Sequence, residues 1–312
     1  MVTRTAHTPV LLDEVLELLD VREGGSYIDG TLGSAGHALA IIERAGRDGR
    51  LLGIDRDREA ITRAGEVLDA HAERCTLVHG NHANVADIAG EHGFGKADGI
   101  LFDLGVSSEQ LDEPARGFSF SRPGPLDMRM DKRERVTAAD LVADLDEEVL
   151  CRVLRENGDE PKAKRIARAI VRARERSALE TTQDLSDVVA GAVGGKKGRL
   201  HPATRAFLAL RIAVNRELSS LEAGLEAGLG ILATGGRMAV ISFHSQEDRV
   251  VKRRFSAHAG RWESLPAGGR VRQGEMPRVS LVNRKPVRPG EPEIKANPRA
   301  RSAKLRVVER AE

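Results

Sequence analysis

The residues best suited to chemistry lie in one short turn near the N-terminus. An apolar segment ends at Asp29 and is followed by Gly30, Gly33 and Gly36, at a spacing of three, and then by an alanine-rich segment. This pattern predicts a strand, a tight turn and the start of a helix. Glycine lets the backbone approach a ligand closely, and helix amides attract polar or anionic groups. The turn is therefore a candidate cofactor site; the alternative is a plain turn between a core strand and a core helix.

Asp29, the acid directly before the first glycine of this turn, helps to distinguish between possible cofactors. A dinucleotide-binding turn has the pattern Gly-x-Gly-x-x-Gly, whereas here Asp29 stands directly before Gly30. A carboxylate in that place repels a pyrophosphate but accepts hydrogen bonds from an ammonium group. The methionine end of S-adenosylmethionine carries such a group. The turn thus favours S-adenosylmethionine, while a dehydrogenase that uses a nicotinamide cofactor stays open as the alternative.

Further polar residues follow the next predicted strands. Asp55 ends the segment 50–55, His82 follows the segment 76–79, and Asp103 ends the segment 98–103. Helical segments separate these strands, so the pattern predicts a parallel sheet whose carboxyl ends hold the ligand. We expect Asp55 to bind the ribose hydroxyls; its alternative role is to cap the helix that starts near Arg58.

A long insertion separates the fourth predicted strand from the fifth, which covers residues 237–242. Met238 follows Asp103 by 135 positions, whereas a βαβ crossover needs only about 30 residues. The inserted sequence has a loop rich in proline, glycine and methionine, then helical patterns, including one helix of roughly thirty residues from Phe207 to Leu232. Residues 278–282 and 304–308 are expected to form an antiparallel pair at the edge of the sheet. The predicted division is 1–112 and 216–312 for the core and 113–215 for the insertion.

Composition is that of an ordinary globular protein, with 312 residues, 40% hydrophobic and 31% charged. No apolar run approaches the roughly 18 to 20 residues needed to cross a bilayer, and the N-terminus lacks the apolar core of a signal peptide. We therefore expect a cytoplasmic protein that does not associate with membranes. Cys75 and Cys151 are far apart and support neither a disulfide framework nor a cysteine-rich zinc site, so packing roles are expected for both.

Charge is distributed unevenly, although the net charge is only +2. Residues 249–312 hold 17 Lys and Arg against 6 Asp and Glu, and residues 160–216 hold 13 against 5. Such charge is often only a solvated face, but a local excess of this size also suits a phosphate backbone. The distribution leaves nucleic acid open as a partner.

Seven stretches, taken together and in order, resemble one family over nearly the whole chain. It is the family of bacterial methyltransferases that use S-adenosylmethionine to modify the N4 atom of a cytidine in 16S ribosomal RNA. The stretches are His7 to Glu14, Asp29 to His37, Asp103 to Ser108, Gly117 to Asp131, His201 to Arg205, Ile241 to Arg249, and Asn297 to Ser302. The resemblance implies a Rossmann-like class I methyltransferase sheet, mostly parallel with an antiparallel edge strand, and an inserted all-helical domain for substrate recognition.

The resemblance also implies a substrate and a set of site residues. The substrate is a decoding-centre cytidine of 16S rRNA within the small ribosomal subunit. The cofactor contacts implied are Ala35, Gly36, His37, Asp55, His82, Asp103 and Gln110, beside Asp29, Gly30 and Gly33 of the turn. Two positions depart from the family pattern: Ala35 stands where a further glycine is common, and His82 where an aromatic residue is common. An imidazole can still stack on adenine.

The requirements of methyl transfer to different target atoms restrict the reaction, independently of the family resemblance. Methylation at C5 of a pyrimidine needs a covalent cysteine nucleophile near the fourth strand, and neither cysteine lies there. An exocyclic amine needs instead hydrogen-bond acceptors and in-line placement. Because the fourth and fifth strands are expected to be neighbours, the predicted catalytic residues are Asp103, Ser107, Ser108, His244 and Ser245. The long helix of the insertion is expected to bring Asn215 to the same region. Alternatively, Asn215 is a surface residue and His244 caps the strand end.

No metal site is predicted, and the oligomeric state is left open between a monomer and a homodimer. A third hypothesis is a non-catalytic RNA-binding or assembly factor that has kept a methyltransferase fold.

Overall fold

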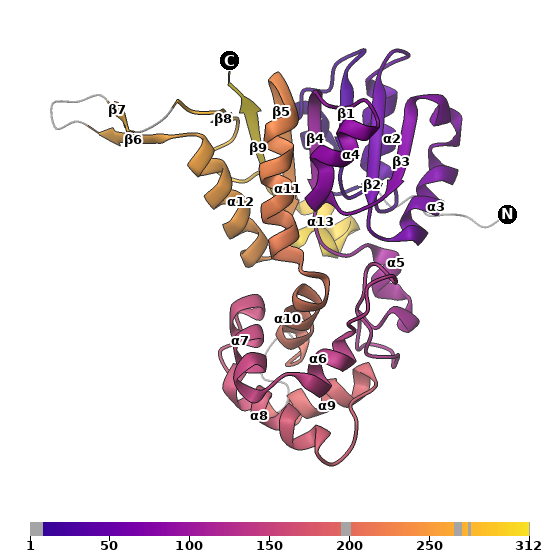
Figure 1. The fold of residues 1–312 in the computed structure, drawn as a ribbon, viewed down its shortest axis with the longest axis vertical. Coiled ribbons are helices and arrows are strands. Elements are labelled where there is room, and N and C mark those ends of the chain that lie inside the picture. The colour runs from indigo at the N-terminus through magenta and orange to yellow at the C-terminus, as the bar shows by residue number, and fades with distance from the viewer. Residues whose placement is uncertain (1–8, 195–200, 265–269, 274–275, 312) are drawn as a thin grey trace. The chain divides into compact units, whose positions relative to one another are not determined.

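The computed structural model describes residues 9–194, 201–264, 270–273 and 276–311 (Figure 1). Two compact units make up the chain: residues 1–105 with 218–312, and residues 106–217. The sequence placed these boundaries after residues 112 and 215, because the short helix α5 (Ser108–Asp112) was assigned to the core rather than to the insertion. His7 and Thr8, which begin the first of the seven stretches, lie outside the described residues.

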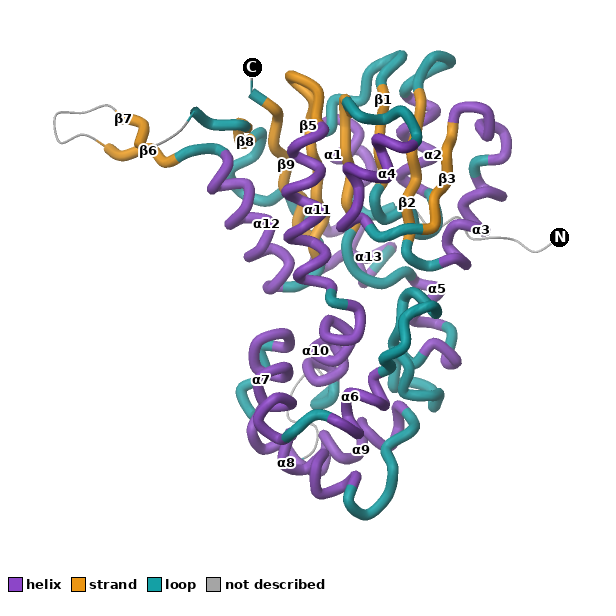
Figure 2. Tube along the Cα trace, viewed as in Figure 1, coloured by secondary structure: helices purple, strands orange, loops and turns teal. Residues whose placement is uncertain are grey.

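The first unit is built on a seven-stranded sheet with the order β3-β2-β1-β4-β5-β9-β8 (Figure 2). The first five strands in sequence pair in parallel, as predicted, whereas β9 is antiparallel to both of its neighbours. The strands are β1 (Ser26–Asp29), β2 (Arg50–Asp55), β3 (Cys75–His79), β4 (Ala97–Asp103), β5 (Leu232–Ser242), β8 (Val279–Leu281) and β9 (Lys304–Arg310). The predicted pair of C-terminal strands is confirmed. Beyond the sheet, β6 (Arg261–Ser264) pairs with β7 (Arg270–Gln273).

Alternation of side chains along each strand gives this sheet two apolar faces. Tyr27 and Leu51 pack in one core cluster, and their neighbours Ile28 and Leu52 pack in the other. The first face is covered by α1 (Leu12–Leu18), α2 (Gly36–Arg44) and α3 (Arg58–Val67). The second is covered by α4 (Val85–Glu91), α11 (Glu217–Ile231) and α12 (Ser245–His258), as Figure 1 shows for the near side. Both faces are thus buried, as a parallel sheet requires.

The second unit is helical and has a core of its own. Its longer helices are α6 (Ala138–Asp144), α7 (Glu147–Gly158), α8 (Ala163–Arg174), α9 (Thr182–Val193) and α10 (Thr204–Asn215). Shorter elements complete the two units. They are the 3-10 turns η1 (Asp69–Arg74), η2 (His82–Asn84), η3 (Pro114–Arg116) and η4 (Pro298–Ser302) and the helix α13 (Glu291–Ala296).

The prediction of one helix from Phe207 to Leu232 is wrong. The chain leaves the helical region at Arg216, whose φ of 50° and ψ of 39° are left-handed, so that α10 ends and α11 begins there. The apolar positions keep their helical spacing on both sides of this residue, which is why periodicity alone did not reveal the break. The break falls next to the boundary between the two units.

Among the described residues, no helix has both the length and the apolar character required to cross a membrane. The two cysteines are free and half-buried, and they pack beside different cores, Cys75 in the first unit and Cys151 in the second. These packing roles agree with the prediction.

Candidate functional site

The turn after β1 is shaped by close backbone contacts. Gly30 donates its N–H to Leu101 O at 2.9 Å, and a Cβ atom on Gly30 would lie 2.3 Å from the Phe102 ring. Ala35 caps α2 with a φ of 61°, a left-handed conformation that glycine adopts at less cost. This conformation explains why a glycine suits the position of Ala35. The turn therefore places Gly36 and His37 in the first turn of α2.

Asp55, at the end of β2, stabilises the turn after β1 through hydrogen bonds. Its Oδ2 accepts a hydrogen bond from Gly33 N at 2.8 Å, and its Oδ1 accepts one from Asp57 N at 2.8 Å. The N-cap of α3 is Asp57, which accepts from Glu59 N at 3.0 Å. The alternative role of Asp55 as the cap of α3 is therefore wrong. Each carboxylate oxygen has a second lone pair with which Asp55 can accept a ligand hydroxyl.

Asp103 and His37 place two hydrogen-bond acceptors opposite each other. His37 Nε2 lies 2.9 Å from Val10 O, and a carbonyl only accepts, so Nε2 carries the hydrogen. The other ring nitrogen, Nδ1, is then an acceptor, and it lies 3.5 Å from Asp103 Oδ2. Asp103 Oδ1 is buried and has no hydrogen-bond partner among the described residues. When Asp103 is ionised, none of the described residues places an N–H or O–H donor between these acceptors.

The electrostatics of these strand ends favour a cation. Burial, together with the charge of Asp55, raises the pKa of Asp29 to about 7. Burial and the charges of Asp29 and Glu247 raise the pKa of Asp103 well above its usual value. Burial also lowers the pKa of His37 to about 4, so this imidazole is neutral and brings no compensating charge. A positively charged ligand would relieve the repulsion between the acids.

His82 lies in η2, directly after β3, and is buried beside Phe102, with the two ring centroids 5.0 Å apart. Its Nε2 has no hydrogen-bond partner among the described residues, and burial lowers its pKa to about 4. Gly224 of α11 makes room for it, because a Cβ atom there would lie 2.8 Å from His82 O. The ring is thus a neutral, mostly apolar surface with one unsatisfied nitrogen. The expected stacking on adenine stays a prediction.

His244 and Ser245 follow β5, and His244 is the N-cap of α12. Its Nδ1 accepts from Glu247 N at 3.4 Å, and its Nε2 lies 3.0 Å from Glu247 Oε1, outside hydrogen-bond geometry. Glu247 Oε2 accepts from Phe243 N at 2.8 Å. Both ring nitrogens therefore face the buried Glu247, which favours the capping role of His244 over a direct role in catalysis.

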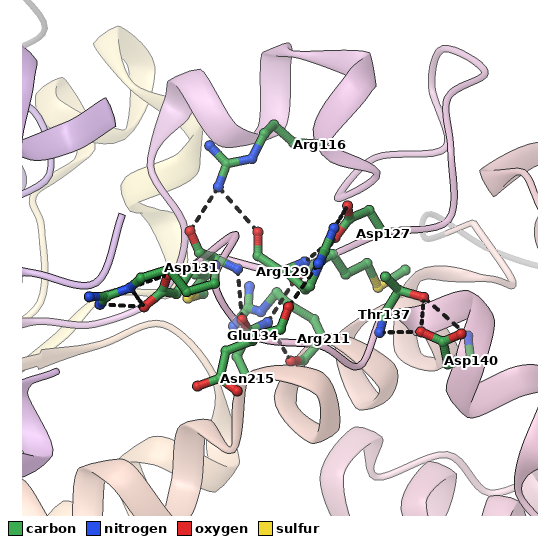
Figure 3. A network of polar contacts seen from close by, with 12 residues as sticks. Arg116, Asp127, Arg129, Asp131, Glu134, Thr137, Asp140, Arg211 and Asn215 are labelled. Atoms are coloured by element: carbon green, nitrogen blue, oxygen red, sulfur yellow. Dashed lines mark hydrogen bonds and ion pairs between the residues drawn. The ribbon is translucent and has the colours of Figure 1, made fainter. Parts of the chain in front are cut away.

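In the second unit, Asn215 ends α10 and is buried. Its Oδ1 accepts from Met130 N at 2.8 Å, and its Nδ2 donates to Met128 O at 2.7 Å and to Arg211 O at 2.9 Å. It is therefore not the surface residue of the alternative reading; it holds the loop between η3 and α6, and Figure 3 shows it among the polar contacts of that loop.

Other polar residues stabilise the same loop. Arg116 is buried, and its guanidinium donates to Arg129 O at 3.1 Å and Met130 O at 3.0 Å (Figure 3). Asp127 and Arg129 form a two-pronged ion pair with both contacts at 2.8 Å. Met128 is fully buried with a φ of 63°, a strained conformation for a long side chain. Buried polar contacts and ion pairs thus hold the loop between η3 and α6 in one defined conformation.

The remaining predicted residues of this unit, Ser107, Ser108 and Gln110, lie at the start of α5. Ser107 caps this helix: its Oγ accepts from Gln110 N at 3.2 Å, and Gln110 Oε1 accepts from Ser107 N at 3.1 Å. Ser108 is the first helical residue. The cofactor contact implied for Gln110 stays a prediction, since its side chain also closes this capping box.

Within the first unit, the structure brings together Asp29, Asp55, His37 and Asp103. Sequence reasoning missed two neighbours of Asp103. Thr31 Oγ1 accepts from Asp103 N at 2.5 Å, and Glu247 adds negative charge. A signal for Glu247 was present, because an acid three residues after an N-cap is the spacing of a capping box.

The order of the sheet, its antiparallel β9 and the acids at the strand ends define a class I methyltransferase. Residues 4–311 match the MraW methylase family. The chain belongs to that family, which confirms the family expected from the seven stretches. S-adenosylmethionine is accordingly its cofactor, and the missing donor beside Asp103 and the acidic strand ends fit the ammonium of its methionine end. The dehydrogenase hypothesis is excluded.

Several curated relatives are similar over almost their entire length. A protein named ribosomal RNA small subunit methyltransferase H from Citrifermentans bemidjiense is 52% identical, with 97% of this chain and 98% of the relative covered. Proteins of the same name from Symbiobacterium thermophilum and Methylococcus capsulatus are each 50% identical, with 97% and 96% of this chain and 96% and 99% of the relatives covered. A solved structure from Clostridium thermocellum, titled "putative rRNA-methylase", aligns with a TM-score of only 0.44 at 13% identity, over 96% of this chain and 94% of that one.

Proposed function

We propose that the protein transfers a methyl group from S-adenosylmethionine to the exocyclic N4 amine of a decoding-centre cytidine in 16S rRNA. It acts in the cytoplasm on the small ribosomal subunit. The names of the relatives support the RNA substrate. The observation that carries the proposal is the buried carboxyl of Asp103 at the end of β4, whose Oδ1 has no partner among the described residues.

The cofactor would be held by residues of the first unit. Asp29 and Asp103 supply carboxyl groups to its ammonium, Asp55 accepts from the ribose hydroxyls, and His82 offers a flat neutral surface to the adenine. Gly30, Gly33, Ala35, Gly36 and His37 form the turn around it. When bound, the cofactor supplies an electrophilic methyl group on a sulfonium sulfur.

The chain's own residues have to orient the amine. The lone pair of the N4 atom is delocalised into the cytosine ring, so acceptors for the amine protons favour a pyramidal, nucleophilic nitrogen. Asp103 is the acceptor that the geometry supports best, because it ends β4 and has a second carboxyl oxygen, the buried Oδ1, without a partner among the described residues. Ser245, the first residue of α12, lies in the same unit as Asp103 and supplies a hydroxyl group, while roles for Ser107 and Ser108 at the start of α5 stay predictions of the sequence.

His244 and Asn215 have supporting roles in this proposal. Asn215 positions the loop between η3 and α6 rather than the base, and His244 positions the start of α12. The cysteines also fit an amine target: Cys75 begins β3 and Cys151 lies in α7, so neither stands at the carboxyl end of β4 for covalent attack on a pyrimidine ring. The target base must be unpaired or flipped out to reach such a site.

The test is methyl transfer to small ribosomal subunits, and in parallel to naked 16S rRNA, both from a strain that lacks the gene. Digestion to nucleosides and mass spectrometry should show a methyl group on N4 of cytidine. Methylation at C5, or at another nucleoside, would contradict the proposed target. No methylation of either substrate would favour the non-catalytic assembly factor. Sedimentation of the purified chain would decide between the monomer and the homodimer.

A further inference from the structure

One helix of the second unit carries an unusual stripe of positive charge. α8 has no acidic residue, and its apolar face is fully buried through Ala163, Ile166, Ala167 and Ile170. Its exposed cations are Lys164, Arg165, Arg168 and Arg172, and the exposed Arg176 follows just after its end. At about 100° per residue, the four cations within the helix occupy an arc centred opposite the buried face. We call Lys164, Arg165, Arg168, Arg172 and Arg176 the α8 stripe.

Four of the five cations of the stripe take no part in the contacts of the fold that the described residues make. The side chains of Lys164, Arg165, Arg172 and Arg176 form no hydrogen bond or ion pair with any residue that the structure describes. Arg168 approaches one carboxylate, Glu147, at 3.4 Å, and its side chain is half exposed.

Arg174 of the same helix, in contrast to the stripe, stabilises the fold through hydrogen bonds. Its guanidinium donates to Val142 O at 2.7 Å and Leu145 O at 2.8 Å, and so satisfies carbonyl groups at the end of α6. Arg174 is accordingly half-buried, while the cations of the stripe are exposed. Arg174, which supports the fold, is thus distinct from the four exposed cations of α8 and from Arg176, which follows the helix.

Five cations in a row repel one another, and an anionic partner would remove that cost. Lys164, Arg168 and Arg172 follow one another at four-residue intervals, so they span about 12 Å along the helix. A strand of duplex DNA carries one phosphate for about every 3.4 Å of its axis, and at a comparable spacing an RNA strand offers about three phosphates over the same length. Neither a small ligand nor a single phosphate would engage the whole stripe.

We propose that the α8 stripe binds the phosphate backbone of the rRNA substrate. This inference rests on the proposed function and deepens it, since it assigns RNA docking to one helix face of the insertion. Because such contacts are made to phosphates, the stripe supplies affinity and orientation without reading sequence.

The experiment measures binding of transcribed 16S rRNA by filter retention over a range of about 50 to 200 mM salt. The variant is the triple substitution Lys164→Gln, Arg168→Gln and Arg172→Gln. We expect its dissociation constant to rise roughly tenfold or more, and the slope of log affinity against log salt to fall by about two to three. S-adenosylmethionine affinity, measured by calorimetry, should stay at the parent value.

Two controls make the result specific. The triple substitution Arg44→Gln, Arg47→Gln and Lys96→Gln removes the same charge from exposed positions before β2 and β4, at the amino ends of the strands. It should leave the salt slope nearly unchanged. The triple substitution Lys164→Arg, Arg168→Lys and Arg172→Lys keeps the charge of the stripe and should retain parent affinity, while circular dichroism checks that each variant is folded.

The outcomes separate this inference from the proposed function. The role of the stripe would be overturned if the α8 variant kept the parent RNA affinity and salt slope. It would also be overturned if the control variant of Arg44, Arg47 and Lys96 lost as much RNA affinity as the α8 variant. A parent chain that binds the RNA but does not form N4-methylcytidine would instead overturn the proposed function and leave the binding comparison valid.

Discussion

The strand ends of the first unit and the α8 stripe of the second are both unbalanced in charge, but in opposite ways. Asp29 and Asp103 are acids that burial has made difficult to ionise. The cations of the stripe are exposed, and only Arg168 has a carboxylate nearby among the described residues, Glu147 at 3.4 Å. Burial makes a charge imbalance costly and therefore selective for one complementary group, whereas exposure makes it cheap and suited to a long, salt-sensitive polyanion. If the α8 stripe binds the RNA as proposed, cofactor and RNA are recognised by different physical means in the two units.

The largest effect is expected from Asp103→Asn. Loss of a charge-assisted contact to the cofactor ammonium should raise the dissociation constant roughly ten- to hundredfold. The folded pKa of Asp103 is raised, so its ionised form costs stability at neutral pH, and the substitution should raise the melting temperature. Calorimetry and thermal melting measure the two quantities.

Asp248→Asn is the matched control for that variant. Although its partial burial acts in the opposite direction, hydrogen bonds from Arg306 and Lys304 lower the pKa of Asp248. Its loss should therefore lower the melting temperature while cofactor affinity stays unchanged. If Asp103→Asn and Asp248→Asn shift the melting temperature in the same direction, burial does not make the ionised form of Asp103 destabilising, as the comparison of the two regions requires.

Asn215→Ala should have the next largest effect, and it concerns stability. The substitution leaves Met130 N and Met128 O without their buried partner, which should cost about 2 to 3 kcal/mol of unfolding free energy in the second unit. Methyl transfer should fall and cofactor affinity should not. Denaturant unfolding is the decisive measurement, because full stability combined with lost methyl transfer would restore the sequence-based expectation that Asn215 touches the base.

The pH dependence of cofactor binding tests the acidic strand ends directly. The pKa of Asp29 is raised to about 7, so below that pH its carboxyl is neutral in the free protein. An ammonium ligand favours the ionised form, so binding releases a proton and affinity should rise with pH through about 7, by at most tenfold per pH unit for each proton. Calorimetry in two buffers of different ionisation enthalpy counts these protons, and an affinity that is flat between about pH 6 and 8 would contradict the assignment.

The smallest effect is expected from Arg299→Gln with Arg301→Gln. These exposed arginines lie in η4 on either side of the buried Ala300. If they contact phosphates, the salt slope for 16S rRNA should fall by about one to two, and stability should change by less than about 0.5 kcal/mol. A loss of stability at constant slope would show that they support the fold of η4 instead.

Much of the first unit was predictable because its signals are local. The segments that end at Asp29, Asp55 and Asp103 are strands in the structure, and the expected parallel pairing of the first five strands is confirmed. Alternating apolar residues, glycines and a terminal acid specify a strand and its turn within about ten residues, independently of the rest of the chain.

The second unit and the detailed roles of site residues depended on contacts that no local pattern encodes. The partners of Asn215 are 85 and 87 residues away in sequence, and the acid that caps α3 is Asp57 rather than Asp55. The break at Arg216 leaves the apolar spacing intact. Sequence alone thus determined which residues reach the strand ends and how charge is divided along the chain. Only the tertiary structure decided which of those polar groups are satisfied and which are left unpaired, because the desolvation that makes the difference arises when distant segments pack together.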